Sequence, residues 1–346
     1  MGRVLRLRFD VPSIALESWM PGDDDRIKLP FDRDGLAGAI SISLSRDSVE
    51  TEPEVDDQGR LLFERPIASR QLEVHVEADW GADWSQNEPR LKAAQQVTDM
   101  YVNGLLSYLA VELGQYWVGS LPIREWGLTY FLKAGNAIWL EGPGESTVLP
   151  QKQSIFAFPP FRDFWEISLA VGPESWGVMS HALEAHYEPD LSMALMTTAM
   201  RHFQNGEYRA AVVESVTAVE VGLSALIRER CKKKGISHNK FKDVSRDLGV
   251  AAYLKILLPL VVDAQELEAW SLTYRERLAD SLVPLPSAPQ EHEGPASIKA
   301  CIDLNKIRNC IVHEGWIPSE QEDLGRMRRG IRAAHWLVAF AADATS

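Results

Sequence analysis

The chain has 346 residues, enough for two hydrophobic cores, since a single core usually stops growing at about 250 to 300 residues. It has no apolar run of about 18 residues and no signal-peptide pattern, so we expect a cytoplasmic protein with no membrane contact. Its three cysteines form no Cys-x-x-Cys pair, which argues against a disulfide framework or a zinc site, and we expect no metal or other cofactor.

The net charge of −13 is unevenly distributed along the chain. Residues 1–190 contain 16 Lys and Arg against 30 Asp and Glu, whereas residues 191–346 contain 20 against 19. An evenly acidic chain would repel nucleic acid, but a neutral C-terminal half can hold local basic clusters. Two such clusters, at 228–234 and 326–332, permit contact with RNA without demonstrating it.

The first half predicts an acidic α+β domain over residues 1–188. Alternating apolar and polar residues indicate half-buried strands, and an amphipathic helix is expected from Pro89 to about Gly114. The acidic, turn-rich stretch 51–59 is expected to be a loop. The expected strands are 4–9, 38–44, 71–78, 126–131 and 137–140. We match this domain to no family, and its ligand stays open.

The second half predicts an all-α bundle over residues 189–346, because helical periodicity replaces the strand pattern. Four prolines between residues 283 and 295 cannot continue a helix and indicate an exposed connection. A capping box at residues 319–322 is expected to open the last helix. The expected helices are 192–205, 207–234, 250–262, 264–279, 297–313 and one running to about 342.

Glu220 falls inside the apolar stripe of the helix 207–234, where Val216 and Leu223 flank it along the sequence. A buried carboxylate needs a cationic or donor partner, and we expect Glu220 to pair with Arg308 or another buried donor in a structural role. The alternative is that Glu220 lies at the edge of the stripe and reaches water. A neighbouring stripe of small residues would let another helix approach closely, and it suggests a homodimer.

Arg308, Asn309 and His313 form the most informative motif, late in the helix 297–313. Asn309 and His313 are one turn apart and are expected to lie opposite the apolar face. Arg308 is about 140° from His313 around the helix, so its side chain must curl toward the histidine, or the site combines two protomers. The Arg–His spacing alone is weak evidence, because Arg70–His75 has the same spacing and Arg329–His335 is only one residue longer.

The chemistry of these residue types suits a phosphodiester. An arginine offers a planar, permanently charged fork for phosphate, and a histidine transfers protons near neutral pH. No Gly-x-x-x-x-Gly-Lys phosphate loop, Gly-x-Gly-x-x-Gly, His-Glu-x-x-His or Gly-x-Ser-x-Gly motif points to another class of enzyme. The plainer alternative, a surface histidine beside an ordinary ion-pairing arginine, stays open at this point.

The C-terminal region resembles the HEPN superfamily (higher eukaryotes and prokaryotes nucleotide-binding). The resemblance is carried by Arg308, Asn309 and His313 followed by Glu314-Gly315, by the helix-turn-helix opening at residues 205–211, and by Glu220. It implies Arg308, Asn309 and His313 as catalytic residues, with supporting roles for Glu220, Lys306 and Glu314.

What the resemblance implies for function is a metal-independent endoribonuclease that acts on RNA as a homodimer. Such domains occur in toxin-antitoxin and anti-phage defence systems, so an antitoxin or regulatory partner is also expected. His313 would move the proton of the ribose 2′-hydroxyl or of the leaving 5′-oxygen, Arg308 would stabilise the phosphorane, and Asn309 would position the ribose or imidazole. The alternative is a non-catalytic HEPN module for dimerisation or for binding a partner protein or nucleotide.

Overall fold

The structure is a computed structural model, and its chain folds into two compact units. The first contains Met1–Glu188 and Ser281–Val283, and the second contains Pro189–Asp280 and Pro284–Ser346. The predicted boundary after residue 188 lies at this division, but the assignment of residues 281–283 to the first unit was not predicted. The structure describes residues 3–16, 26–33, 36–43, 67–78, 96–119, 137–141, 165, 168–185, 187–236, 249–279, 281, 290–318 and 321–345.

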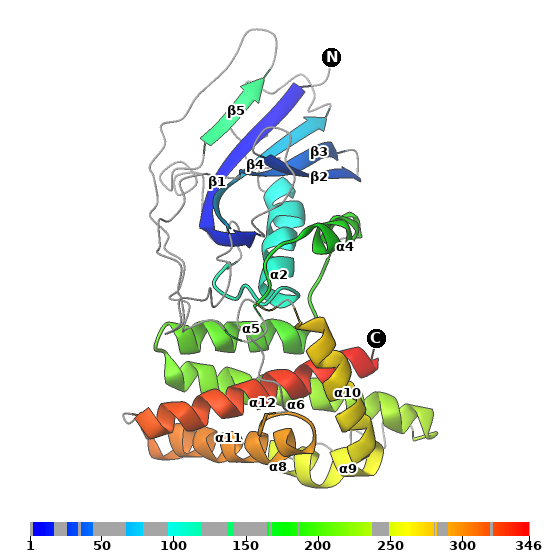
Figure 1. Cartoon of the computed structure of the whole chain (residues 1–346), viewed down its shortest axis with the longest axis vertical. Helices are drawn as coiled ribbons and strands as arrows, with labels where there is room; N and C mark the ends of the chain where they lie inside the picture. Colours follow the sequence, from blue (N-terminus) through cyan, green and yellow to red (C-terminus); the bar gives the residue numbers. More distant parts are fainter. Residues whose placement is uncertain are drawn as a thin grey trace, which may run out of the picture. The chain divides into compact units, whose positions relative to one another are not determined.

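The first unit is built on a five-stranded antiparallel sheet with the order β2-β3-β4-β1-β5 (Figure 1). The strands predicted at 4–9, 38–44, 71–78 and 137–140 correspond to β1, β3, β4 and β5. Strand β2 was not predicted, and its Pro30 is tolerated because an edge strand leaves one side of its backbone unpaired. The strands are β1 (Arg3–Leu16), β2 (Arg26–Arg33), β3 (Leu36–Ser43), β4 (Ile67–Ala78) and β5 (Ala137–Glu141).

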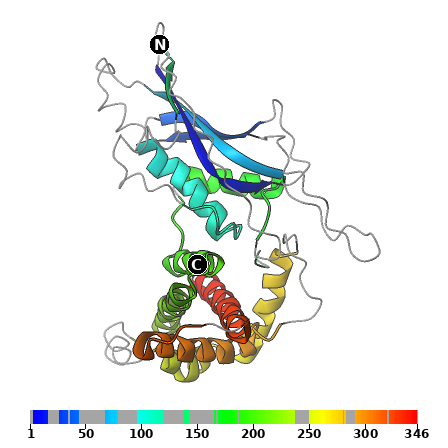
Figure 2. The same cartoon turned by 90° about the vertical axis from the view of Figure 1, so that its left-hand side faces the viewer.

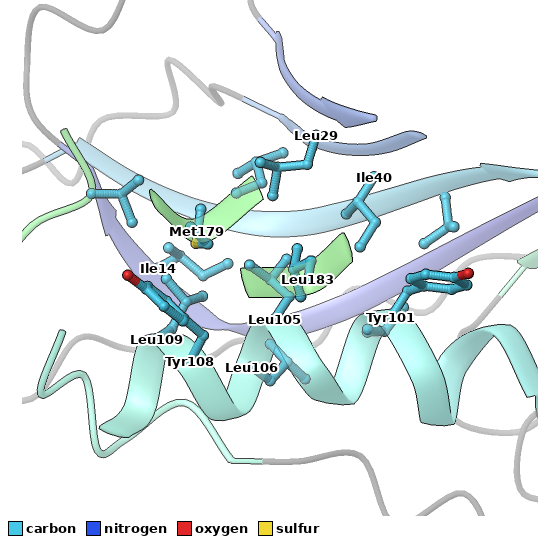
Figure 3. Packing of buried hydrophobic residues seen from close by; sticks show 14 of the residues in the cluster. Ile14, Leu29, Ile40, Tyr101, Leu105, Leu106, Tyr108, Leu109, Met179 and Leu183 are labelled. Carbon is cyan, nitrogen blue, oxygen red and sulfur yellow. The ribbon is translucent and has the colours of Figure 1, made fainter. Parts of the chain in front are cut away.

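One face of this sheet carries an apolar row across four strands. Leu7 is paired with Val74, Val74 with Ile40, and Ile40 with Leu29, and all four side chains are buried. Three helical segments supply the other side of this core: η1 (Thr98–Val102), α2 (Asn103–Val111) and α4 (Pro173–Glu184). Their side chains that meet the sheet residues in Figure 3 include Tyr101, Leu105, Leu109, Met179 and Leu183.

Three predicted elements of the first unit lie wholly or partly outside the described residues. The helix predicted from Pro89 to Gly114 corresponds to η1 and α2, and its first residues lie outside the described part of the chain. The same is true of the predicted strand 126–131 and the predicted loop 51–59. Helix α4 was not predicted, although Pro173 at its first position is a helix-start signal.

The second unit is helical throughout its described elements, so the chain as a whole is α+β. Each predicted helix of this half is present, with ends displaced by a few residues. The long helix α6 contacts α5, α11 and α12 and lies at the centre of the packing. The helices are α5 (Leu191–Gln204), α6 (Tyr208–Lys233), the continuous segment α8 (Val250–Ala252), η3 (Tyr253–Leu257) and α9 (Leu258–Val261), then α10 (Ala264–Arg277), α11 (Pro295–Glu314) and α12 (Gln321–Thr345).

The small-residue stripe of α6 is used inside the chain. A Cβ atom on Gly222 would lie 3.2 Å from the Ser192 Oγ atom of α5 and 3.6 Å from the Ala341 Cβ atom of α12. These two helices therefore make the close approach that the stripe permits. The expectation that the stripe serves a homodimer is wrong, because its residues are already covered within one chain.

Helix α6 also passes a test of length and hydropathy for a membrane span, and it is the one helix in the described ranges that does so. More than half of the residues in its most apolar window are buried inside the unit. A central helix surrounded by α5, α11 and α12 is expected to be apolar on most sides, which accounts for its hydropathy.

Helices α11 and α12 form an antiparallel pair, next to each other in both views (Figures 1 and 2). Gly330 of α12 faces Leu304 of α11 so closely that a Cβ atom on the glycine would lie 2.9 Å from the leucine Cβ atom. This contact fixes the position of α11 along the axis of α12. Arg308 lies one turn beyond Leu304 on α11, so the contact also fixes where Arg308, Asn309 and His313 lie along α12.

Candidate functional site

The C-terminal end of α11 has a helix-ending arrangement that places His313 in the last turn. Gly315 has a positive φ of 68°, a conformation that suits glycine because it lacks a Cβ atom. The backbone N–H of Trp316 donates a hydrogen bond to the carbonyl of Cys310 at 3.2 Å. The carbonyl end of α11 therefore lies beside His313.

Helix α11 has one buried face and one exposed face, as predicted. Leu304, Ile307 and Ile311 point into the unit and are buried. Asn309 and His313, one turn apart, are exposed on the opposite side. The amide and the imidazole therefore share a surface that a large ligand such as RNA can reach.

Arg308 lies between these two faces and is half-buried. Its Nη1 atom donates a hydrogen bond to the Oδ1 atom of Asn309 at 3.1 Å, so the guanidinium reaches round to the side of the amide. Within the described part of the chain, no carboxylate pairs with it. Most of its five N–H donors are thus available to an anionic ligand.

His313 makes no hydrogen bond or ion pair within the described ranges, and both ring nitrogens are open to a ligand. The other histidines with a similar Arg–His spacing differ. His335 is buried in α12 with its Nδ1 atom 2.9 Å from the Tyr274 hydroxyl oxygen. His75 and Arg70 both lie on strand β4, where residues five apart point to opposite faces of the sheet. Among the three pairs, Arg308 and His313 alone combine a helix with an exposed imidazole.

The supporting residues Lys306 and Glu314 are both exposed, and Glu314 is the last residue of α11. The Lys306 ammonium pairs with the Asp303 carboxylate at 2.7 Å, three residues before it on the same helix. An exposed pair of this kind contributes little to stability and is readily exchanged for another anion. Lys306 is therefore placed to contribute positive charge beside Asn309.

The expectation for Glu220 is wrong, because its side chain is exposed on α6 and is not paired with Arg308. The predicted stripe is buried at Val216, Leu223 and Ile227, but the buried face of α6 extends toward Val219 and Leu226 and leaves Glu220 outside it. Glu220 is about 100° of helix rotation from Val219, on the flank of the buried face. The alternative, that it lies at the edge and reaches water, is the observed one.

The second basic cluster divides between the surface and the interior of its unit. Arg326 and Arg329 are exposed on α12, and Arg326 lies 4.0 Å from the Asp323 carboxylate. Arg328 and Arg332 are half-buried. The first cluster is partly neutralised, since Arg230 pairs with Glu266 of α10. The exposed charge available to RNA is thus smaller than the sequence count suggests.

Two aliphatic side chains close to His313 were not singled out from the sequence. Val312 is 49% exposed and Ile317 is 66% exposed, on either side of the histidine along the chain. Single exposed aliphatic side chains are common on protein surfaces, and these two matter here because they lie within five residues of each other along the chain, next to the motif. Their exposure depends on how α11 ends, so the sequence offered no signal for it.

Comparisons with known proteins give no assignment: no family model matches the chain, and neither a curated protein nor a solved structure is similar to it. In the described ranges, no three His, Cys, Asp or Glu side chains gather into a group that could hold a metal ion.

Proposed function

We propose that this chain is a metal-independent endoribonuclease of the HEPN type, with Arg308, Asn309 and His313 as its catalytic residues. One observation carries the proposal. An unpartnered imidazole shares an exposed helix face with an amide, and that amide holds a guanidinium that no carboxylate of the described residues neutralises. An anion that approaches this face meets fixed positive charge beside a proton-transfer group.

In the mechanism, His313 transfers the proton of the ribose 2′-hydroxyl or of the leaving 5′-oxygen. Arg308 stabilises the charge that accumulates on the phosphorane, through the N–H donors that Asn309 leaves open. Asn309 positions the ribose or the imidazole. These groups account for proton transfer and charge stabilisation, so the reaction needs no divalent ion for either step.

We place the active form in a homodimer whose two motifs meet at one surface. The wide angle between Arg308 and His313 around α11 leaves room for each protomer to complete the site of the other. The exposed Val312 and Ile317 would supply the apolar contact around it. In the cell, such an enzyme fits a cytoplasmic toxin or anti-phage effector that an antitoxin or regulatory partner restrains.

The experiment is cleavage of a single-stranded RNA by the full chain, with and without excess EDTA. We expect equal rates in both, products with 2′,3′-cyclic phosphate ends, and no cleavage of DNA or of 2′-O-methyl RNA, which lack the attacking hydroxyl. Removing a proton-transfer group typically lowers a rate by about 10²- to 10⁴-fold. His313→Asn and Arg308→Gln should therefore each nearly abolish cleavage, whereas His202→Asn, at a half-buried histidine of α5 that pairs with Glu207, should not.

The second candidate function is a non-catalytic module that binds a partner through the face of His313. The same exposed aliphatic pair, Val312 and Ile317, favours it. It takes the place of the ribonuclease if the purified wild-type chain cleaves no RNA, or if His313→Asn cleaves as fast as wild type. In that case Ile317→Gln should weaken partner binding while Arg308→Gln leaves it unchanged.

A further inference from the structure

A polar cluster lies inside the second unit, where α10, α12 and the turn before α11 meet. None of its members belongs to the motif on α11, and the sequence gave no reason to group them. The cluster combines two buried histidines with an arginine–glutamate pair and a tyrosine hydroxyl. Its members are Tyr274 and Arg275 of α10, His292 and Glu293 of the turn, and Arg332 and His335 of α12.

Two contacts join α10 to the rest of this cluster. The Tyr274 hydroxyl oxygen lies 2.9 Å from the Nδ1 atom of His335. Arg275 grips the Glu293 carboxylate with two parallel bonds, from Nε at 2.7 Å and from Nη2 at 3.0 Å. The Glu293 side chain is only 6% exposed, so water screens this pair weakly.

Apolar packing of α10 is slight by comparison. Only two of its 14 residues, Leu267 and Ser271, are buried, and Leu272 is 64% exposed. Trp270 makes aromatic contacts with Trp336 and Phe340 of α12, but its indole N–H also bonds to an exposed carboxylate. Polar contacts therefore attach much of α10: Glu266 pairs with Arg230 of α6 and Arg277 with Asp343 of α12, and the pair of Arg275 with Glu293 is more buried than either.

Protonation of the two histidines acts against these contacts. Burial lowers the pKa of His335 to about 4, with a further contribution from His292. Burial also lowers the pKa of His292 to about 4, and Arg332 and Arg275 add to this. Among the described groups that face them, the carboxylate is Glu293, which lies 4.0 Å from the His292 Nε2 atom but is already held by two bonds from Arg275. An imidazolium here would thus be a buried charge beside two arginines.

The course of the chain gives α10 a further role. After α10 the chain enters Ser281–Val283, which belong to the first unit, and Ser281 forms a backbone bridge there with Leu169. It returns to the second unit and passes through His292 and Glu293 into α11. Helix α10 and the cluster thus lie on the covalent path from the first unit to the helix that carries Arg308 and His313.

We propose that α10 is a detachable helix, latched to α12 and to the start of α11 by this cluster, and that the latch opens when His292 and His335 take up protons. Opening releases α10, the helix that precedes Ser281 of the first unit along the chain. The proposal concerns local opening and does not depend on whether α11 cleaves RNA.

The test is hydrogen–deuterium exchange of the full-length chain at pH 7.5 and pH 5.5, with rates corrected for the intrinsic effect of pH. A histidine with a pKa near 4 in the latched state and near 6.5 when released favours opening by about tenfold at pH 5.5. Two histidines give about a hundredfold loss of protection in α10 and residues 290–294. Protection in α5 and α6 should change much less.

Variants separate the latch from general acid sensitivity. Asparagine places an amide close to the Nδ1 position of histidine and does not titrate, so His292→Asn with His335→Asn should leave α10 with the same protection at both pH values. His202→Asn, outside the cluster, should keep the wild-type response. The proposal is wrong if α10 in wild type is as protected at pH 5.5 as at pH 7.5, or if α5, α6 and α10 lose protection together. These readings need only the wild-type chain.

Discussion

Replacing Gly330 with alanine tests the packing that fixes the position of α11, the helix of Arg308 and His313, along α12. The new Cβ atom would lie 2.8 Å from the Cδ1 atom and 2.9 Å from the Cβ atom of Leu304. The leucine Cβ atom is fixed to the α11 backbone and cannot swing away, so the two helices must separate. Overpacking of this kind costs about 1–3 kcal/mol. Because the leucine Cβ atom cannot move, we take the upper half of this range, about 2–3 kcal/mol; alanine regains about 0.5–1 kcal/mol in a helix, so we expect a net loss of about 1–2 kcal/mol.

Gly325, on the same helix, provides the matched control. A Cβ atom there would meet only the Nη1 atom at the flexible end of Arg329, at 3.9 Å. Gly325→Ala should therefore keep the helix gain and stabilise the unit by up to about 1 kcal/mol. The assay is thermal unfolding followed by far-UV circular dichroism, in which a loss of 1–2 kcal/mol lowers the Tm by about 2–8 °C. The reasoning fails if Gly330→Ala is as stable as Gly325→Ala.

Two further predictions concern the protonation of His292 and His335 and the substitution of Glu220 on α6. The pKa of His292 and of His335 is lowered to about 4 in the folded chain from 6.5, so their stabilisation is complete above about pH 6.5 and is lost as the pH falls toward 4. At pH 5.5 the loss is about 1.4 kcal/mol per histidine, which urea unfolding of wild type against the double asparagine variant measures; equal pH profiles would contradict it. Glu220→Gln should change the free energy of unfolding by less than about 0.5 kcal/mol, because the side chain is exposed, and a larger loss would point to a buried partner.

The sequence predicted well those features that depend on local periodicity. The two faces of α11 follow from the spacing of Leu304, Ile307 and Ile311, which any helix must place on one side. The sheet row of Leu7 and Val74 follows in the same way from alternation. Strand β2 was not predicted because Pro30 interrupts its pattern. The proline is tolerated because β2 is an edge strand, and an edge position is a property of the assembled sheet.

Glu220 shows where local periodicity is insufficient. Several stripes along α6 are apolar, and the sequence does not say which one faces the centre of the unit. The choice is made by the partners: Ser192 of α5 and Ala341 of α12 approach Gly222, and this turns the flank that carries Glu220 toward water. Val216, Leu223 and Ile227 of the predicted stripe are buried, and Glu220 is exposed because the buried face extends away from it, toward Val212 and Val219.

The three Arg–His pairs make the same point about function. Arg70–His75, Arg308–His313 and Arg329–His335 have spacings of five or six residues and are hard to tell apart by sequence, although a phosphodiester needs an imidazole that it can reach. Tertiary structure separates them: His335 bonds to Tyr274, 61 residues away along the chain, and is buried, whereas the end of α11 leaves His313 exposed. A contact over that distance has no local signature, so burial of His335 was beyond sequence reasoning. The same burial that disqualifies His335 as a catalyst makes it suitable for the latch of α10, because a buried neutral imidazole resists protonation until its surroundings open.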